Sequence, residues 1–314
     1  MAFLGIDIGG TNIKCTLIDA DSSVLASTQV PTNPDGSIDA ILRGINGAIT
    51  NLNRDSIAFE GACFGIPGPV DSVTNTVVMA PNLGWMASTD ICGPAAELLG
   101  CSVVVANDAT CAASGEAHFG AGREYKSFLL LTLGTAVGAA LVQDGRPFSG
   151  YGRYGGELGH IPLVHGGIPC SCGIDGCFEQ YGSATALTRI AASCAKKDPT
   201  SMMASADVNA LKAEDVVAAA IQGDCAALDA FDEYTTYLAK GTAGLVNIFR
   251  PDAVIYAGGL ANAGELLRKE AELKLAKYTC ASEIVGSPRV VLSGNASNIG
   301  ALGAAMIASQ QASL

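Results

Sequence analysis

The chain alternates between two spacings of its apolar residues, and this alternation predicts a mixed α/β fold. Short apolar runs bounded by Gly, Pro or Asp predict buried strands, whereas apolar residues three and four positions apart predict helices. The expected strands span residues 3–8, 13–18, 24–30, 58–66, 102–106, 127–133, 139–142, 253–256 and 289–292. The expected helices span residues 37–52, 91–99, 107–117, 178–195, 213–221, 226–249, 265–277 and 299–308.

The two halves of the chain repeat one arrangement, in which a strand, a turn with Gly and Thr, and a second strand follow each other. The turn is Gly9-Gly10-Thr11 in the first half and Gly134-Thr135 in the second. Glycine lets backbone amides come close to phosphate oxygens, and the Thr hydroxyl adds a donor. Two such turns facing a cleft are therefore expected to hold one triphosphate between two domains.

Length and composition indicate a folded protein of two domains. The chain has 314 residues, of which 49% are hydrophobic and only 15% are charged. We expect an N-terminal α/β domain over 1–112, with a closing helix over 298–314 packed back on it. The C-terminal domain, over 113–297, would carry a metal-binding loop.

Charge and cysteine content exclude several classes of function. A net charge of −12 argues against nucleic-acid binding, which requires a positive face. No apolar run approaches the ~20 residues of a membrane span, and the N-terminus lacks the pattern of a signal peptide. Eleven cysteines, an odd number, favour a reducing cytoplasm with core thiols and a metal site over a disulfide framework.

The first motif with chemical potential is Asp7-Ile8-Gly9-Gly10-Thr11-Asn12-Ile13-Lys14. Gly10 and Thr11 would cradle phosphate, Lys14 would add a cation, and Asp7 would orient water on Mg²⁺. An ordinary Gly-Gly hairpin explains the same residues equally well. The motif is neither a dinucleotide fingerprint, because a strand follows where a helix is needed, nor a Walker loop.

Asn107 and Asp108 stand between an expected strand and an expected helix. Taken alone, the pair is explained best as a helix N-cap, a position that Asn and Asp favour. The functional alternative makes Asp108 a base that accepts a hydroxyl proton, with Asn107 holding the substrate.

Three cysteines fall within eight residues, at Cys170, Cys172 and Cys177, with glycines that permit a tight knuckle. With His160 they would complete a closed, tetrahedral and therefore structural Zn²⁺ site, for which His165 is a rival fourth ligand. Such a site would fix the loop that carries Glu157 and Glu179.

Glu157 and Glu179 offer acceptors for sugar hydroxyls, which need them; surface charge is the alternative explanation. Gly258-Gly259 follows a buried strand, so it predicts either a backbone shelf beneath an adenine or a plain strand-to-helix turn.

Together these motifs resemble the ROK family of sugar kinases and repressors over nearly the whole chain. The resemblance covers the Asp7–Lys14 motif, the sugar-side loops 65–71 and 80–85, Asn107-Asp108-Ala109 and the turn 133–138. The pattern Glu157-x-Gly159-His160 with the three cysteines and Glu179 is close to diagnostic of the zinc-bearing members.

The resemblance implies a two-domain fold of the actin, hexokinase and Hsp70 type (ribonuclease H-like) with an interdomain cleft. It implies ATP-dependent phosphorylation of a hexose hydroxyl, usually O6, with glucose as our first choice and Asp108 as base. It further implies homodimers or homotetramers. The implied sugar ligands are Gly68, Asn82, Asn107, Asp108, Glu157, His160 and Glu179. The implied ATP and Mg²⁺ ligands are Asp7, Gly10, Thr11, Asn12, Lys14, Gly134, Thr135, Gly258 and Gly259. Zinc would be held by His160, Cys170, Cys172 and Cys177.

The chain departs from the family pattern at Ala136 and Ala139, where glycines are usual near the second phosphate turn. A methyl group there would narrow the approach to phosphate. N-acetylglucosamine, N-acetylmannosamine, fructose and allose are alternative substrates, and a sugar-sensing regulator without catalysis is the alternative of another class. Asp7 lies almost at the start of the sequence, so we expect no DNA-binding module ahead of it.

Overall fold

The structure is a computed structural model, which describes residues 2–33, 35–52, 57–80, 83–148, 156–204, 210–294 and 298–312. The chain divides into two compact units. The first unit comprises residues 1–126, 140–156 and 295–314, and the second comprises residues 127–139 and 157–294.

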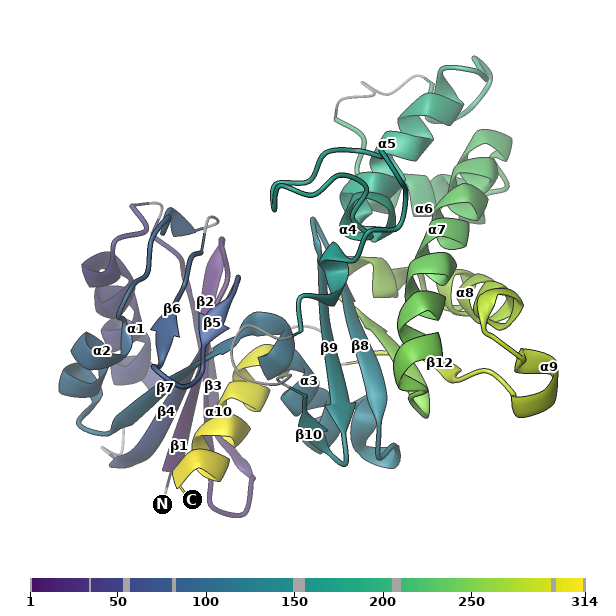
Figure 1. Ribbon diagram of the computed structural model, residues 1–314. Helices are drawn as coiled ribbons and strands as arrows, with labels where there is room; N and C mark the ends of the chain where they lie inside the picture. Colours follow the sequence, from purple (N-terminus) through teal and green to yellow (C-terminus); the bar gives the residue numbers. More distant parts are fainter. Residues whose placement is uncertain are drawn as a thin grey trace. The chain divides into compact units, whose positions relative to one another are not determined.

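The sheet of the first unit has five strands in the order β3-β2-β1-β4-β7 (Figure 1). β1 and its neighbour β2 are antiparallel, as are β2 and β3, whereas β1, β4 and β7 run parallel. Two short strands form a separate hairpin. The bounds are Ala2–Ile8 (β1), Asn12–Asp19 (β2), Val24–Pro31 (β3), Phe59–Ile66 (β4), Val70–Asp71 (β5), Thr76–Val77 (β6) and Ser102–Asn107 (β7).

Helices cover both faces of this sheet, because successive side chains of a strand point to opposite faces. On one face Leu4 and Ile6 of β1 pack in a core with Ile41 and Ile45 of α1 (Ile38–Leu52), and α2 (Cys92–Leu99) adds Ala95. On the other face lie α3 (Asp108–Phe119) and α10 (Ile299–Ala312), as Figure 1 shows. The contacts within the chain group α10 with the first unit.

Glycines allow α3, α10 and the sheet to approach each other at backbone distance. A Cβ atom on Gly115 of α3 would collide with the carbonyl of Ile299, and one on Gly303 of α10 with the carbonyl of Cys111. Gly5 of β1 meets the backbone of α10 in the same way. The position of α3, and of its first residue, therefore depends on these positions being glycine, which has no side chain.

The second sheet repeats the strand order of the first, as β10-β9-β8-β11-β12. Its strands are Phe128–Leu133 (β8), Val137–Gln143 (β9), Arg146–Pro147 (β10), Ala253–Ala257 (β11) and Arg289–Leu292 (β12). In chain order both sheets read third, second, first, fourth and fifth strand, so the repetition predicted for the two halves extends to whole sheets.

Helices supply much of the core of the second unit, where Tyr234 and Leu238 of α7 pack with Leu131 of β8 and Val254 of β11. The predicted helix over 178–195 is wrong in one respect, because it is broken at Ser183. The Ser183 hydroxyl accepts from the Ala186 N–H and begins a new helix. The bounds are Glu179–Gly182 (α4), Ala184–Ala195 (α5), Ala213–Ile221 (α6), Cys225–Phe249 (α7), Glu265–Tyr278 (α8) and Ser282–Val285 (α9).

The domain boundary expected after residue 112 falls inside α3. That helix continues without a break to Phe119, and the contacts within the chain group residues up to 126 with the first unit. Because α3 is one continuous helix that packs along α10, a boundary at residue 112 would divide it.

Substitution of Gly115 by Val tests the close packing of α3 on α10. The added side chain must separate the two helices, so we expect the free energy of unfolding to fall by about 3 kcal/mol. Gly47→Ala in α1 is the control, because a Cβ there meets nothing within 4 Å. Replacing that exposed helical glycine should stabilise the protein by about 1 kcal/mol. Urea unfolding of both variants measures the contrast, and equal stabilities would contradict it.

Candidate functional site

The carboxyl ends of three parallel strands bring the first group of predicted residues to one edge of a sheet. Asp7 of β1 lies opposite Gly65 of β4, and Gly65 lies opposite Ala106 of β7. With adjacent strands about 4.8 Å apart, the backbone at Asp7 lies within about 10 Å of Ala106. Asn107 and Asp108 follow directly, so the hairpin motif and the start of α3 share this edge.

The buried thiol of Cys111 lies close enough to Asp7 and Asp108 for both carboxylates to influence its pKa. A hydrogen bond with Cys63, followed by burial, holds the pKa of the Cys111 thiol well above its ordinary value. The negative charges of Asp7 and Asp108 raise the pKa of Cys111 further. The two aspartates therefore act on one point in the first unit.

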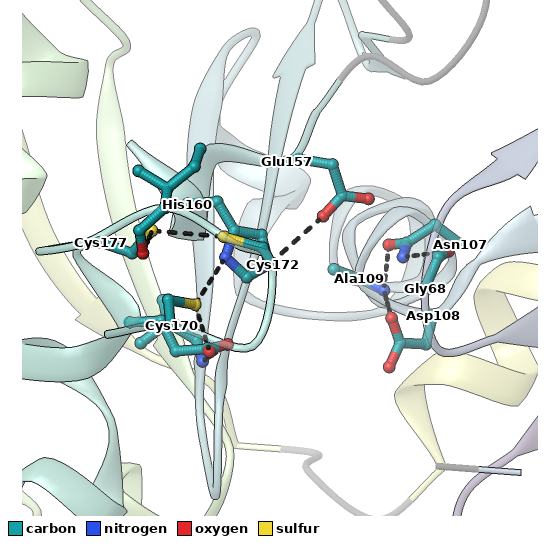
Figure 2. Close-up of polar contacts among 12 residues, drawn as sticks. Gly68, Asn107, Asp108, Ala109, Glu157, His160, Cys170, Cys172 and Cys177 are labelled. Atoms are coloured by element: carbon teal, nitrogen blue, oxygen red, sulfur yellow. Dashed lines mark hydrogen bonds and ion pairs between the residues drawn. The ribbon is translucent and has the colours of Figure 1, made fainter. Parts of the chain in front are cut away.

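Asn107, and not Asp108, is the N-cap of α3 (Figure 2). The Asn107 Oδ1 atom accepts from the N–H groups of Ala109 at 2.9 Å and Thr110 at 3.3 Å. Its amide nitrogen donates to the carbonyl of Gly68 at 3.1 Å. Asp108 is the first helical residue, and its Oδ1 atom accepts from the Ala109 N–H at 2.8 Å. Asn107 therefore supplies the N-cap of α3, and Asp108 follows it within the first turn.

Only glycine fits at position 68, in the loop after β4. Gly68 has φ +107°, and a Cβ atom would collide with the carbonyl of Met79. Its own carbonyl is held by Asn107, so the loop after β4 is tied to the start of α3. The other predicted sugar ligand of the first unit, Asn82, lies outside the described residues.

The hairpin between β1 and β2 presents its tip to solvent. The N–H of Gly9 donates to the Asn12 carbonyl at 3.0 Å, and the hydroxyl of Thr32 donates to the Gly9 carbonyl at 2.6 Å. Gly10 and Thr11 are exposed at the tip, and a Cβ at Gly10 would meet nothing within 4 Å. Space for a ligand at these amides is therefore present.

Asp7 and Lys14 lie opposite each other on β1 and β2. Burial raises the pKa of the Asp7 carboxyl above its ordinary value of 3.8, and the positive charge of Lys14 opposes that rise. A carboxylate held in this way gains from a second cation nearby.

The turn between β8 and β9 is tied to the start of α5. The carbonyl of Gly134 accepts from the Ala184 N–H at 2.8 Å, and the carbonyl of Thr135 accepts from the Thr185 hydroxyl at 2.9 Å. Ala136 is exposed, whereas Ala139 packs in the core of the second unit. The methyl group of Ala139 therefore does not narrow the turn.

A cavity of about 570 Å³ opens beside this turn, entirely within the second unit. Three predicted nucleotide residues line it, namely Gly134, Thr135 and Gly259. Gly258 precedes Gly259 in the chain and supports this wall through its backbone. It has φ +85°, and a Cβ atom there would stand 2.7 Å from the Leu133 carbonyl oxygen, so only glycine fits. The remaining lining residues are Leu133, Ala184, Thr185, Thr188, Lys212, Ala213, Glu214, Val217, Ala218, Ile221, Leu260, Asn262 and Ala263.

Sequence reasoning missed the wall of this cavity that α6 contributes. Nothing in the spacing of Val217 and Ala218 distinguishes a cavity wall from an ordinary amphipathic helix. Ile221 is a large apolar residue at the end of α6, and the structure leaves it 67% exposed. Such exposure at the mouth of a cavity is typical of a binding surface.

His160 and the three predicted cysteines converge in the second unit (Figure 2). One ligand atom from each of the four lies within 4.8 Å of all the others. The Cys172 and Cys177 sulfurs are 3.5 Å apart, and Cys170 Sγ is 3.5 Å from Nδ1 of His160. A tetrahedral shell with Zn²⁺-like bond lengths has ligand atoms about 3.5–3.8 Å apart, so these side chains fit one metal ion. Among the described residues His165 is not part of the cluster.

The two predicted sugar-binding glutamates flank the cluster. Oε1 of Glu179 lies 3.7 Å from Cys170 Sγ, and its Oε2 accepts from the Val137 N–H at 3.4 Å. Oε2 of Glu157 lies 4.0 Å from Nε2 of His160. Burial raises the pKa of Glu157, with His160 opposing and Glu179 adding to the rise.

The backbone of one residue, Val137, connects the turn after β8 to this group. Its carbonyl lies against Gly159, where an added Cβ atom would collide with that carbonyl. Its N–H donates to Glu179. The turn, Glu179 and the segment Glu157–His160 are therefore one packed assembly.

Within the part of the chain that the structure describes, no helix has both the length and the apolar character to cross a bilayer.

Known proteins share this architecture along the whole chain. A ROK family glucokinase from Streptomyces griseus, solved in complex with glucose and AMPPNP, is 31% identical with a TM-score of 0.84, covering 99% of this chain and 100% of that one. A glucokinase from Thermotoga maritima is 33% identical over 310 residues, covering 98% of this chain and 97% of that protein. A glucokinase from Streptomyces coelicolor is 33% identical over 271 residues, or 84% of each chain.

The paired sheets and these matches define a protein with the actin and hexokinase type of fold, as predicted. The model of the ROK family matches residues 3–311, and the chain belongs to the ROK family. The resemblance drawn from the motifs is thereby confirmed.

Replacement of Asp7 by Asn tests the electrostatic setting of the hairpin. A carboxyl whose pKa is raised by folding favours the folded state at low pH and disfavours it once ionised. Asp7→Asn should therefore raise the free energy of unfolding at pH 7, and the gain should shrink as the pH falls towards 3.8.

Urea unfolding at pH 4 and pH 7 measures this difference. A variant that is less stable than the native protein at pH 7 would contradict the assignment. A stabilised variant that loses turnover would separate the role of Asp7 in function from its role in folding.

Proposed function

We infer that the chain is an ATP-dependent sugar kinase that transfers the γ-phosphoryl group of ATP to a hydroxyl of glucose, most simply O6. The observation that carries this inference is the full-length match to the glucokinase solved with glucose and AMPPNP. The local geometry supports it, because Gly134, Thr135 and Gly259 line one cavity and His160 converges with the three predicted cysteines.

We assign the adenosine of ATP to the cavity of the second unit. Its walls are largely apolar, as a base requires, and Thr135 of the turn at its edge would meet the phosphates. Gly258 and Gly259 form the backbone shelf below. In the first unit Gly10, Thr11, Asn12 and Lys14 would receive the terminal phosphates.

Asp7 would hold the water shell of Mg²⁺, which is usually bound through one or two carboxylates and the phosphates. The raised pKa of Asp7 fits this role, since the carboxylate lacks sufficient compensating charge in the protein alone. Mg²⁺, when bound, neutralises charge on the transferring group.

Asp108 would accept the proton of the attacking sugar hydroxyl. Asp108 is the first helical residue of α3, directly after the N-cap Asn107, and the N-terminus of a helix favours negative charge. A phosphoryl transfer needs proton removal only late, so a weak base suffices and positioning contributes most of the acceleration.

The sugar would be bound by acceptors and one donor around the cluster. Glu157 and Glu179 supply carboxylates to hydroxyl protons, and Asn107 with the Gly68 loop would contact the sugar from the first unit, together with Asn82. In His160 the Nδ1 atom lies 3.5 Å from Cys170 Sγ, and Nε2 lies 4.0 Å from Oε2 of Glu157, so one ring can serve both the metal and the sugar side.

We assign Zn²⁺ to His160, Cys170, Cys172 and Cys177, because three thiolates and an imidazole with these separations suit that ion. All four positions are protein groups, so the metal would be structural. Binding at Nδ1 leaves the proton on Nε2, which becomes a hydrogen-bond donor for a sugar hydroxyl.

We further infer a cytoplasmic location, since none of the eleven cysteines forms a disulfide in the structure. The homodimer or homotetramer expected from the family stays a prediction.

An ADP-release assay with a panel of sugars tests the proposed function. We expect ATP turnover that depends on glucose, with lower kcat/KM for fructose, allose and the two N-acetylhexosamines. A preference for an N-acetylhexosamine would change the assigned substrate but leave the protein a sugar kinase. Absence of sugar-dependent turnover in folded, metal-loaded protein would contradict the kinase itself and favour a sugar-sensing regulator.

Ala218→Trp tests the assignment of the cavity in the same assay. The indole fills space beside Val217, so KM for ATP should rise about tenfold or more while KM for glucose changes little. Leu273→Trp is the control, because Leu273 is 70% exposed on α8 and does not line the cavity. Equal KM values for ATP in the two variants would remove the cavity from the nucleotide site.

Cys172→Ser tests the metal. Loss of one thiolate should lower the zinc content and loosen His160 and Glu179, raising KM for glucose about tenfold or more. Cys225→Ser is the control, as that cysteine is exposed and outside the cluster. Elemental analysis and glucose kinetics give the readouts, and freshly purified protein without zinc would contradict the assignment.

A further inference from the structure

We propose that Tyr181 is a positioning residue for the sugar site: its hydroxyl fastens the loop with the Cys/His cluster to helix α4, which begins with Glu179. The proposal rests on the function inferred above for its effect on sugar binding. Its structural part stands on hydrogen bonds within the second unit alone.

Ile168 is the point at which the loop is held, because both of its backbone groups are bonded. Its N–H donates to the Tyr181 hydroxyl at 2.9 Å, and its carbonyl accepts from the Gly176 N–H at 2.8 Å. Ile168 stands two residues before Cys170, and Gly176 stands directly before Cys177. One residue thus links two ligand-bearing segments to each other and to α4.

The ring of Tyr181 is itself fixed, so its hydroxyl has a defined place. The side chain is 7% exposed, and its ring centroid lies 4.9 Å from that of Tyr237. The guanidinium carbon of Arg189 lies 5.8 Å from the same ring. The loop approaches so closely that a Cβ atom on Gly167 would collide with the Tyr181 hydroxyl.

Helix α4 needs such an anchor because it is only one turn long. A single turn has too few internal hydrogen bonds to be stable by itself, so tertiary contacts set its direction. Glu179 leads this turn, with one carboxylate oxygen 3.7 Å from Cys170 Sγ. The bond from Tyr181 to Ile168 therefore controls the spacing between a sugar-binding carboxylate and the metal loop.

Tyr181→Phe and Tyr237→Phe form a matched pair that tests this proposal. Both remove one oxygen from stacked rings, but within the described residues the Tyr237 hydroxyl has no hydrogen-bond partner, whereas Tyr181 Oη binds Ile168. In Tyr181→Phe the Ile168 N–H loses its acceptor, so its hydrogen exchange should accelerate about tenfold. KM for glucose should rise about fivefold, while kcat and KM for ATP stay within about twofold. Tyr237→Phe should change none of these.

Gly167→Ala provides a second route to the same contact and removes no hydrogen-bonding group. Its methyl group would collide with the Tyr181 hydroxyl and would also stand 3.0 Å from Gly176 Cα and Val164 Cβ, so Ile168 exchange is its readout. It replaces Tyr181→Phe if that variant fails to fold. The proposal is overturned if Ile168 exchange or the glucose KM is the same in Tyr181→Phe and Tyr237→Phe. It is also overturned if kcat falls with KM unchanged. If the native protein does not phosphorylate glucose, the function fails, and Ile168 exchange alone decides the role of Tyr181.

Discussion

The first residue of α3 is held in place by backbone contact between α3 and α10. Gly115 and Gly303 let the two helices approach without side chains between them, and Gly5 does the same for α10 and β1. The start of α3 is thereby fixed at the edge of the sheet to which the strand register also brings Asp7. With Asn107 as the N-cap, Asp108 follows as the first residue of the helix, so the fold sets its place at this edge.

The second unit fixes its functional groups by different means. Around the cluster the chain has little regular structure, so individual hydrogen bonds, and the metal ion that we propose there, hold its segments together. Val137 joins the turn between β8 and β9 to Glu179, and Tyr181 joins the loop of the Cys/His cluster to α4. Such a site depends on single contacts, so conservative substitutions there should alter sugar affinity before they alter the fold.

Most elements were predictable because their apolar periodicity matches their burial, as for α1, α6 and β11. The ligand-bearing motifs were predictable from spacing within short segments, as for the cluster. The break at Ser183 was missed because serine, although it favours N-caps, is also tolerated inside helices, and tertiary contacts decide between the two. The cavity wall on α6 and the link from Ile168 to Tyr181 join residues whose pairing follows only from the folded chain.

The most direct test of the account compares sugar binding with turnover in Asp108→Asn. Asparagine keeps the size of the side chain, and Asn107 still caps α3, so the protein should fold and bind glucose with nearly native affinity by calorimetry. Without a base, kcat should fall by about 10²–10⁴. Turnover close to that of the native protein would show that the proton goes elsewhere and that the edge of the first sheet is not the catalytic site.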